Sequence, residues 1–402
     1  MQTTLTAAVL STPEGQEADA ILRSCVHCGF CTATCPTYQL LGDELDGPRG
    51  RIYLIKQMLE GQPVTRDTQI HLDRCLTCRA CETTCPSGVR YGRLADIGRG
   101  IAEQRVARPL TERVFRRLLR GVLPHPNRFG SLLRLGQHVR PLLPKSLRTK
   151  IPPPQAVGEW PTAQHTRRML VLAGCAQSST TPNTNAAAAR VLDRLGISLI
   201  TAPTAGCCGA LSHHLSAETE ALNFMRRNID AWWPYIEQGI ETIVMTASGC
   251  GVMVKEYGPL LAHDPGYADK AARISALTRD LSEVLAAEDL TKLGNFGKNR
   301  RIAVHAPCTL QHGQNLPGAV EGLLTNLGFE LTEVRDSHLC CGSAGSYSLL
   351  QPKLSQQLRD NKLDALQSGK PELIVTANVG CQLHLASGSE VPVRHWIELL
   401  DD

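Results

Sequence analysis

The sequence predicts an α + α/β protein, in which an all-α N-terminal domain precedes a tandem pair of α/β half-domains. Three observations lead to this fold class. Residues 25–85 carry two matched runs of cysteine, and the segments around these runs have helical spacing. Residues 167–402 alternate short apolar runs with helical patterns, which is typical of parallel sheets. The second half of that region repeats the first half.

The first run is Cys25-x-x-Cys28-x-x-Cys31-x-x-x-Cys35-Pro, and the same spacing returns from Cys75 to Cys85. Three thiolates at intervals of three can bind one iron-sulfur cube, whereas the fourth, followed by proline, points away and binds the other cube. Zinc, the alternative, prefers two separated cysteine pairs and leaves the middle thiol and the proline unexplained. The spacing therefore predicts a two-cluster ferredoxin-like domain with two 4Fe-4S clusters. Its expected ligands are Cys25, Cys28, Cys31 and Cys85 for cluster 1, and Cys75, Cys78, Cys81 and Cys35 for cluster 2.

Helices are expected around both runs. Residues 15–24 lead into the first run, residues 51–60 follow a Gly-Pro-Arg-Gly turn, and residues 68–73 lead into the second run. Apolar positions from 94 to 106 continue as another helix. We expect the two-cluster domain to comprise residues 1–106.

Two arginines flank the end of the turn between the runs. Arg49 and Arg51 could neutralise a reduced cluster or bind Asp43 and Glu44. We favour structural ion pairs.

Residues 107–166 are expected to be a basic helical segment followed by a proline-rich linker. From Arg99 to Lys150 there are thirteen Lys or Arg and two acids, although the net charge of the chain is only +4. Prolines from 141 onward interrupt any regular element. A solvated face, an anionic lipid surface and an acidic partner stay open as interpretations. Nucleic acid is not expected, because no aromatic stacking pattern accompanies the charge.

The tandem region begins with an apolar strand from 168 to 174. A helix, a strand, a second helix and a strand that ends near residue 246 follow it. The interval from the first cysteine to the Cys-Cys pair is 32 positions in both copies. The expected segments are a first half at 167–264, a mostly helical connector at 265–299 and a second half at 300–402.

Each copy places four cysteines where strands end. The carboxyl ends of parallel strands meet at the edge where α/β sheets bind ligands, so four thiols should converge in each copy. The functional interpretation is a further iron-sulfur cluster or metal, and the alternative is buried, unliganded cysteine. The residues concerned are Cys175, Cys207, Cys208 and Cys250 in the first copy, and Cys308, Cys340, Cys341 and Cys381 in the second.

Three stretches carry a resemblance to a known family. They are Cys-Val-His-Cys-Gly-Phe-Cys-Thr-Ala-Thr-Cys-Pro-Thr-Tyr at 25–38, Gly-Asp-Glu-Leu-Asp-Gly-Pro-Arg-Gly-Arg-Ile at 42–52 and Asp-Ser-His-Leu-Cys-Cys-Gly-Ser-Ala-Gly at 336–345. The chain resembles glycolate oxidase (glycolate dehydrogenase) iron-sulfur subunits, and its tandem region resembles the Cys-Cys-Gly domain of heterodisulfide reductases. The fuller family pattern ends each copy with Cys-x-x-Cys, whereas Met253 and His384 take the last position here. This departure puts in doubt a five-cysteine non-cubane cluster, and we interpret the two residues as a packing Met and a hydrogen-bonded His.

Absent motifs limit the chemistry of the chain. It has no Gly-x-Gly-x-x-Gly after a strand, no P-loop and no nucleophile elbow, so no residue of the chain is expected to be catalytic and the chain itself is expected to bind no flavin or nicotinamide. Oxidation of a hydroxy acid needs such a cofactor, so substrate chemistry is expected on a partner subunit. The resemblance implies an electron-transfer subunit beside an FAD-containing subunit that oxidises glycolate to glyoxylate. It also implies a second flavoprotein-like subunit and a quinone or similar acceptor.

Several alternatives stay open. They are a D-lactate or other 2-hydroxy acid dehydrogenase, a glycerol-3-phosphate dehydrogenase, a heterodisulfide or quinone reductase that acts through the Cys-Cys-Gly domain, and a zinc-holding scaffold.

The sixteen cysteines predict a reducing compartment, because thiols in cluster spacing would be oxidised outside it. The first fifteen residues lack the basic and apolar pattern of a signal peptide, and no segment has the roughly 20 apolar residues of a spanning helix. We expect a cytoplasmic protein that lies peripherally on the cytoplasmic face of the inner membrane.

Overall fold

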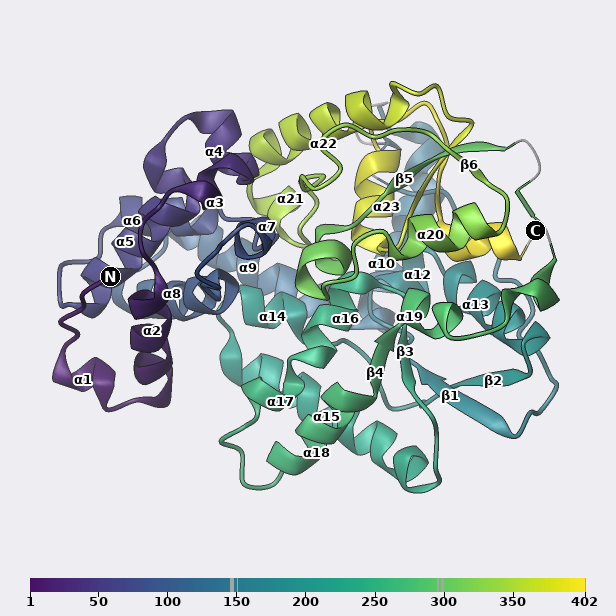
Figure 1. Ribbon diagram of the computed structural model, residues 1–402, viewed down its shortest axis with the longest axis horizontal. Helices are drawn as coiled ribbons and strands as arrows, with labels where there is room; N and C mark the ends of the chain where they lie inside the picture. The colour runs from purple at the N-terminus through teal and green to yellow at the C-terminus, as the bar shows by residue number, and fades with distance from the viewer. Residues whose placement is uncertain (145–147, 150, 295, 298–299, 402) are drawn as a thin grey trace. The chain divides into compact units, whose positions relative to one another are not determined.

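The computed structural model describes all residues except 145–147, 150, 295, 298–299 and 402 (Figure 1). The chain forms two compact units. The first comprises residues 1–116, 214–216 and 338–362, and the second comprises residues 117–213, 217–337 and 363–402. The boundaries expected from the sequence stay a prediction.

The first unit is helical. Helix α2 shows why its segment folds this way: Pro13 opens it, and the side chain of Thr12 accepts a hydrogen bond from the backbone N–H of Gly15 at 3.1 Å. The four helices expected in this region are all present, although their ends differ by a few residues. The helices are α1 (Ala7–Leu10), α2 (Pro13–Ser24), α3 (Phe30–Ala33), α4 (Pro36–Leu41), α5 (Pro48–Leu59), α6 (Arg66–Asp73), α7 (Ala80–Thr83), α8 (Tyr91–Arg105) and the start of α9 (Leu110–Val122), with a 3₁₀ turn η1 at Glu44–Asp46.

The two cysteine loops repeat in backbone conformation as well as in sequence. His27 and Thr77, each two residues after the first cysteine of its run, have φ of 56° and 53°. Gly29 and Arg79, each directly after the second cysteine, have φ of 85° and 61°. Left-handed conformations are costly for residues other than glycine, so their recurrence at matched positions shows that both loops are wound in the same way.

Apolar side chains of α2, α5 and α8 form the core of the first unit. Leu22, Ile55 and Leu94 are fully buried there. Gly98 permits close packing of α8 on α5, because a Cβ atom at this position would lie 2.6 Å from Ile55 Cγ1. This core supports the cysteine loops that leave the same helices.

The second unit contains two parallel four-stranded sheets with the same topology. The first sheet has the order β2-β1-β3-β4, and its strands are β1 (Arg167–Val171), β2 (Ile197–Thr201), β3 (Ile243–Met245) and β4 (Thr278–Asp280). The second has the order β6-β5-β7-β8, with β5 (Arg301–His305), β6 (Glu330–Leu331), β7 (Leu373–Thr376) and β8 (Val393–His395). This repeat confirms the predicted α + α/β fold class.

Helices connect the strands of both sheets. Those around the first sheet are α10 (Pro126–Val139), α12 (Gln177–Thr180), α13 (Asn183–Arg194), α14 (Ala210–His214), α15 (Glu218–Glu237), α16 (Ser248–Lys255), α17 (Tyr257–Leu260), α18 (Ala268–Leu277) and α19 (Leu281–Ala286). Those of the second half are α20 (Ala319–Asn326) and α23 (Val379–Ala386), together with α21 (Tyr347–Leu350) and α22 (Pro352–Gln367), of which α21 and most of α22 belong to the first unit. Four shorter turns complete the chain, namely 3₁₀ turns η2 (Arg140–Leu142), η3 (Leu290–Leu293) and η5 (Trp396–Leu400) and a π-helical turn η4 (Thr309–Gly313).

The two halves of the second unit share one core. Val171 and Val244 of the first sheet and Val304 and Val375 of the second belong to the same buried cluster. A backbone hydrogen bond also joins the segments that follow β3 and β7, since Ser248 N–H donates to Ala377 O at 3.1 Å. The parts of the two half-domains that belong to the second unit are therefore one folded body.

Two strands differ from the expectations drawn from the sequence. Residues 278–280 form β4, although the sequence predicts a mostly helical connector there. Residues 393–395 form β8, which the sequence does not predict. Both strands have only three residues, too few to show a period, and they form because the backbone polar groups along β3 and β7 need a partner.

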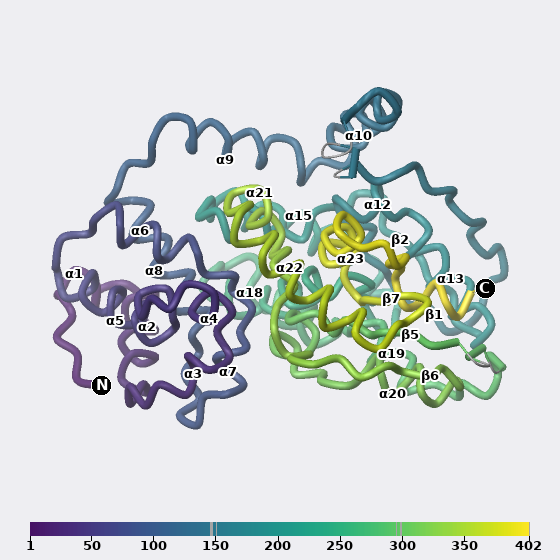
Figure 2. The backbone as a smooth tube through the Cα atoms, turned by 90° about the horizontal axis from the view of Figure 1, so that it is seen from above, coloured from purple at the N-terminus to yellow at the C-terminus, as the bar shows by residue number. Residues whose placement is uncertain are grey.

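The chain passes from the first unit to the second within α9, and α10 follows in the second unit; the two helices can be followed in succession in Figure 2. Residues 152–165 of the predicted linker contain no helix or strand. Residues 145–147 and 150 of that linker lie outside the described residues. Across the described chain, none of the helices combines the length and apolarity needed to cross a bilayer.

Candidate metal centres

The first cavity in the helical unit is lined by the first three cysteines of the first run. Cys25, Cys28 and Cys31 border it together with Cys85, the last cysteine of the second run. Cys81 also reaches its wall. The fold thus brings Cys85 to the motif that precedes it by more than fifty residues.

The second cavity shows the reciprocal arrangement. Cys75, Cys78 and Cys81 line it together with Cys35, the last cysteine of the first run. Cys81 and Tyr91 border both cavities, so the two lie side by side. Each group of four thiols required by the crossed pattern is present in this unit.

The thiols fit iron-sulfur clusters by their chemistry. No acidic residue is among the described residues that line either cavity. Burial, followed by the neighbouring Cys25, raises the pKa of Cys31 to about 11, and burial raises the pKa of Cys81 well above its ordinary value. Crowded thiols of this kind lose their protons when a metal ion compensates the charge. The sites therefore offer the soft thiolate ligands that iron-sulfur clusters take, and they leave hard cations without oxygen ligands.

A buried arginine lies beside the second cavity. Arg51 is 1% exposed, and its Nε donates to His71 O at 2.7 Å. Both terminal nitrogens donate to Thr37 Oγ1 at 3.2 Å, and Thr37 Oγ1 lies 3.3 Å from Cys35 Sγ. Arg51 also borders the cavity itself. A fixed positive charge is thus held next to the second group of cysteines.

Asp46 is the buried carboxylate of this network. Its Oδ1 lies 3.4 Å from Arg51 and 3.1 Å from His71 Nδ1, and its Oδ2 accepts from Arg74 at 2.8 Å. The expected pairing of Arg51 with Asp43 or Glu44 is therefore wrong. The side chain instead points inward from α5, toward Asp46 of η1 and the end of α6. Arg49 does bind Glu44, at 2.6 Å, as expected.

Cys75 receives several interactions that favour its thiolate. Tyr91 O–H donates to Cys75 Sγ at 3.5 Å, and the backbone N–H of Thr77 donates to it at 3.4 Å. Burial alone would raise the pKa of Cys75, but Arg51 and Arg99 outweigh burial and lower it. The second site therefore has a buried arginine beside it, whereas Arg49 beside the first site is more than one-third exposed.

The first Cys-Cys-Gly copy gathers its four cysteines. Cys175, Cys207, Cys208 and Cys250 form a chain of thiol hydrogen bonds in that order. A hydrogen bond from Cys175 lowers the pKa of Cys207, but the bond to Cys208 and burial raise it to about 12. The predicted convergence of these thiols at the carboxyl ends of the strands is present.

Two buried polar side chains hold the Cys207-Cys208 turn. Asn228 Nδ2 donates to Cys207 O at 2.9 Å, and Tyr257 O–H donates to Cys208 O at 2.9 Å. Gly209 follows with φ of 91°, and its N–H donates to Cys207 Sγ at 3.4 Å. Glycine is required here by this left-handed backbone.

The second copy reproduces parts of this arrangement in each unit. In the segment 338–362, Gly342 has φ of 85°, and its N–H donates to Cys340 Sγ at 3.4 Å. In the second unit, Asn378 Nδ2 donates to Cys381 Sγ at 3.4 Å, and Cys308 follows β5. Cys341 on the segment 338–362 is buried.

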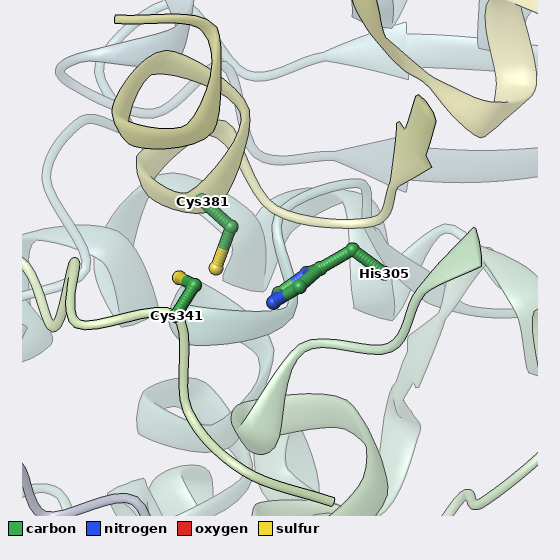
Figure 3. Close-up of side chains that lie close together, drawn as sticks. All are labelled: His305, Cys341 and Cys381. Carbon is green, nitrogen blue, oxygen red and sulfur yellow. The ribbon is translucent and has the colours of Figure 1, made fainter. Parts of the chain in front are cut away.

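His305 is a site residue that the sequence pattern does not single out. It ends β5 and is buried, and its Nδ1 lies 3.0 Å from Thr376 Oγ1. Figure 3 shows its imidazole turned toward the thiol of Cys381. A ring nitrogen of His305 and Cys381 Sγ lie within 4.8 Å of each other. Its position three residues before Cys308, at a strand end, is the signal that could have identified it.

Met253 is buried in the apolar cluster that also contains Cys208, which agrees with a packing role. Tyr91, Asn228 and Tyr257 are further site residues that the sequence does not predict, because a lone tyrosine or asparagine far from a motif carries no sequence signal.

Comparison with known proteins agrees with this geometry. The 4Fe-4S dicluster domain family matches residues 21–89, and the Cysteine-rich domain family matches residues 169–255 and 302–386. The Glycolate oxidase iron-sulfur subunit of Escherichia coli (strain K12) is 61% identical over 402 residues, which cover 100% of this chain and 98% of that protein. The Probable glycolate oxidase iron-sulfur subunit of Bacillus subtilis (strain 168) is 31% identical over 92% of this chain and 89% of that protein.

A more distant relative is a Fumarate reductase (CoM/CoB) subunit of Methanothermobacter marburgensis, which is 24% identical over 97% of this chain and 74% of that protein. The dicluster and cysteine-rich domains identify an iron-sulfur protein, as predicted. With two relatives above 30% identity across nearly its whole length, the chain belongs to the family of glycolate oxidase iron-sulfur subunits.

Proposed function

We propose that the chain is the electron-transfer subunit of an FAD-dependent glycolate dehydrogenase. It accepts electrons singly from a flavoprotein subunit that oxidises glycolate to glyoxylate, and it passes them toward a quinone or similar acceptor. The pair of adjacent four-cysteine cavities is the observation that carries this proposal. The E. coli relative is named a glycolate oxidase subunit, and this name supports the choice of substrate.

The proposed ligands follow the crossed pattern. Cys25, Cys28, Cys31 and Cys85 would hold the first cluster, and Cys75, Cys78, Cys81 and Cys35 the second. The membership of each cavity lining supports this assignment. When bound, such clusters exchange single electrons. The chain itself fixes the thiols, surrounds them with apolar side chains and places Arg51 and Tyr91 beside them.

A further iron-sulfur cluster or metal is proposed for the Cys-Cys-Gly copies. In the first copy, the hydrogen-bonded chain of Cys175, Cys207, Cys208 and Cys250 offers four thiols to one ion or cluster. In the second copy the candidate ligands are Cys308, Cys340, Cys341 and Cys381. Asn228 and Tyr257 fix the first turn through backbone carbonyls, which leaves its thiols available as ligands.

The proposed partners are an FAD-containing subunit and a second flavoprotein-like subunit. The sequence contains none of the nucleotide-binding motifs considered above, which supports the proposal that partner subunits carry the flavin. We further propose that the chain lies peripherally on the cytoplasmic face of the inner membrane, where a quinone can be reached. The basic segment between 99 and 150 supports this location.

The test uses the chain purified without oxygen. We expect about eight irons from the helical unit, with any excess assigned to the Cys-Cys-Gly copies. Glycolate added together with the FAD subunit should produce EPR signals of the reduced chain, and glycolate added without that subunit should produce none. The chain could instead bind iron but stay oxidised with glycolate, and become reduced by D-lactate or glycerol 3-phosphate together with the matching flavoprotein. That result would show that it serves a related dehydrogenase.

A further inference from the structure

Helix α9 is amphipathic, but its apolar side is the exposed one. A surface helix of a globular protein normally packs its apolar face on the core and turns its charges to water. In α9 the exposed side chains include Leu110 (65%), Val114 (48%), Phe115 (42%) and Leu118 (59%). Residues spaced in this way lie on one side of a helix, so they form a continuous apolar stripe.

The opposite side of α9 is held by charged side chains. Arg116 donates to Asp73 at 3.1 Å, and Glu112 pairs with Arg66 and, at 3.4 Å, with Arg108. Arg116 and Asp73 are largely buried. These ion pairs fix the rotation of the helix, and this rotation directs the stripe outward.

The surroundings of the stripe are basic. Between residues 110 and 142 there are seven arginines and one acidic residue, Glu112. Arg113 and Arg117 are exposed on α9 next to the stripe. Helix α10 continues the pattern with the exposed Leu132 and Leu135. Exposed leucines flanked by arginines, with few acids, are the composition of helices that lie in the interface of anionic membranes.

We propose that the outward face of α9, formed by Leu110, Val114, Phe115 and Leu118 with Arg113 and Arg117, binds an anionic phospholipid surface. This inference rests on the proposed peripheral location and names the residues responsible. The apolar stripe would enter the boundary between head groups and acyl chains, while the arginines bind lipid phosphates. A protein partner bound to this face of α9 would need acidic residues to pair with the same arginines.

The test measures flotation of the iron-loaded chain with vesicles. Vesicles that contain phosphatidylglycerol should bind the chain, whereas pure phosphatidylcholine vesicles should bind it weakly. Leu110→Asp and Leu118→Asp should each weaken binding about tenfold, because a leucine no longer leaves water. Arg113→Gln and Arg117→Gln should each weaken it about fivefold at low salt and less at high salt.

Leu349→Asp is the matched control, because this leucine of α21 is also exposed (48%) but lies outside the stripe. It should leave flotation unchanged. Equal binding of wild type to both vesicle types, or unchanged binding by the aspartate variants, would overturn the proposal. So would variants that bind vesicles normally but no longer bind the flavoprotein subunit, because the stripe would then be a protein interface.

Iron content and reduction by glycolate with the FAD subunit are measured on the same samples. If both are normal while wild type fails to float, the lipid surface is refuted and the proposed function stands. If reduction fails while flotation succeeds, the proposed function fails alone.

Discussion

Replacing Arg51 with glutamine should lower the midpoint potential of the second cluster while leaving the first nearly unchanged. The side chain is buried and positively charged, and it is held by His71 O, Thr37 and Asp46. A positive charge stabilises the added electron of a reduced cluster, so its removal makes reduction harder.

The magnitude follows from the contacts. Arg51 lies 3.2 Å from Thr37 Oγ1, which lies 3.3 Å from Cys35 Sγ, so the nitrogen is within about 6.5 Å of that sulfur. A unit charge slightly farther from the cluster centre is worth about 2 kcal/mol at an effective dielectric constant of about 20. For a one-electron couple this corresponds to about 90 mV. Asp46 offsets part of this shift, so about 90 mV is an upper value.

The assay is an EPR-monitored redox titration of the iron-loaded chain. Arg51→Lys should restore most of the potential, because it keeps the charge, even though the fork of hydrogen bonds is lost. Arg49→Gln is the matched control, because Arg49 is partly exposed and paired with Glu44, and should leave the second midpoint in place. Equal shifts in Arg51→Gln and Arg51→Lys would refute the electrostatic reasoning. So would a shift of the first cluster alone.

Three further predictions concern the second unit and the Cys-Cys-Gly turns. Burial raises the pKa of Asp280 to about 6, above its ordinary value, so the stability that its protonated form contributes is present below about pH 4 and is lost as the pH rises through 6. Asp280→Asn should therefore raise the free energy of unfolding by about 2 kcal/mol at pH 7.5 and leave it unchanged at pH 4. Chemical denaturation at both pH values checks this. Gly342→Ala should lower the free energy of unfolding by about 2–4 kcal/mol in thermal or chemical unfolding, because φ is 85° and the new Cβ would lie 2.6 Å from Ser355 O. Gly318→Ala, where φ is 71° and the surrounding space is open, should lower it by only about 1 kcal/mol. Equal losses in the two variants would contradict the role of the close contact. Asn228→Ala should destabilise the chain by about 1–3 kcal/mol, because Cys207 O loses a buried donor, and a fully stable variant in chemical denaturation would show that the turn does not need it.

Sequence reasoning succeeded where one chemical requirement acts over a short stretch of chain. Strand β2 (Ile197–Thr201) lies between two helices, in the predicted order of elements, because an apolar run between a helix and a turn has few other solutions. The carboxyl-edge placement of Cys175 and Cys250 follows from parallel strand topology.

Prediction from the sequence failed where segments far apart in the chain determine which residues pair. Arg51 has acidic residues at 43, 44 and 46 within reach along the sequence. Only the packing of α6 and of the residue after it, which supply His71 and Arg74, selects Asp46. Strand β8 forms because β7 exposes an edge, which the sequence of residues 393–395 does not record. Tyr91 reaches Cys75 because α8 starts directly over the second cavity.

The crossed assignment of ligands is tested most directly by iron counts and EPR spectra of Cys35→Ser and Cys85→Ser. Cys35 lines the second cavity and Cys85 lines the first. Cys35→Ser should therefore weaken or remove the cluster of Cys75, Cys78 and Cys81, up to a loss of about four irons, and should keep the spectrum of the other cluster. Cys85→Ser should do the reverse. Loss of the local cluster in each variant, with the opposite one intact, would contradict the crossed arrangement.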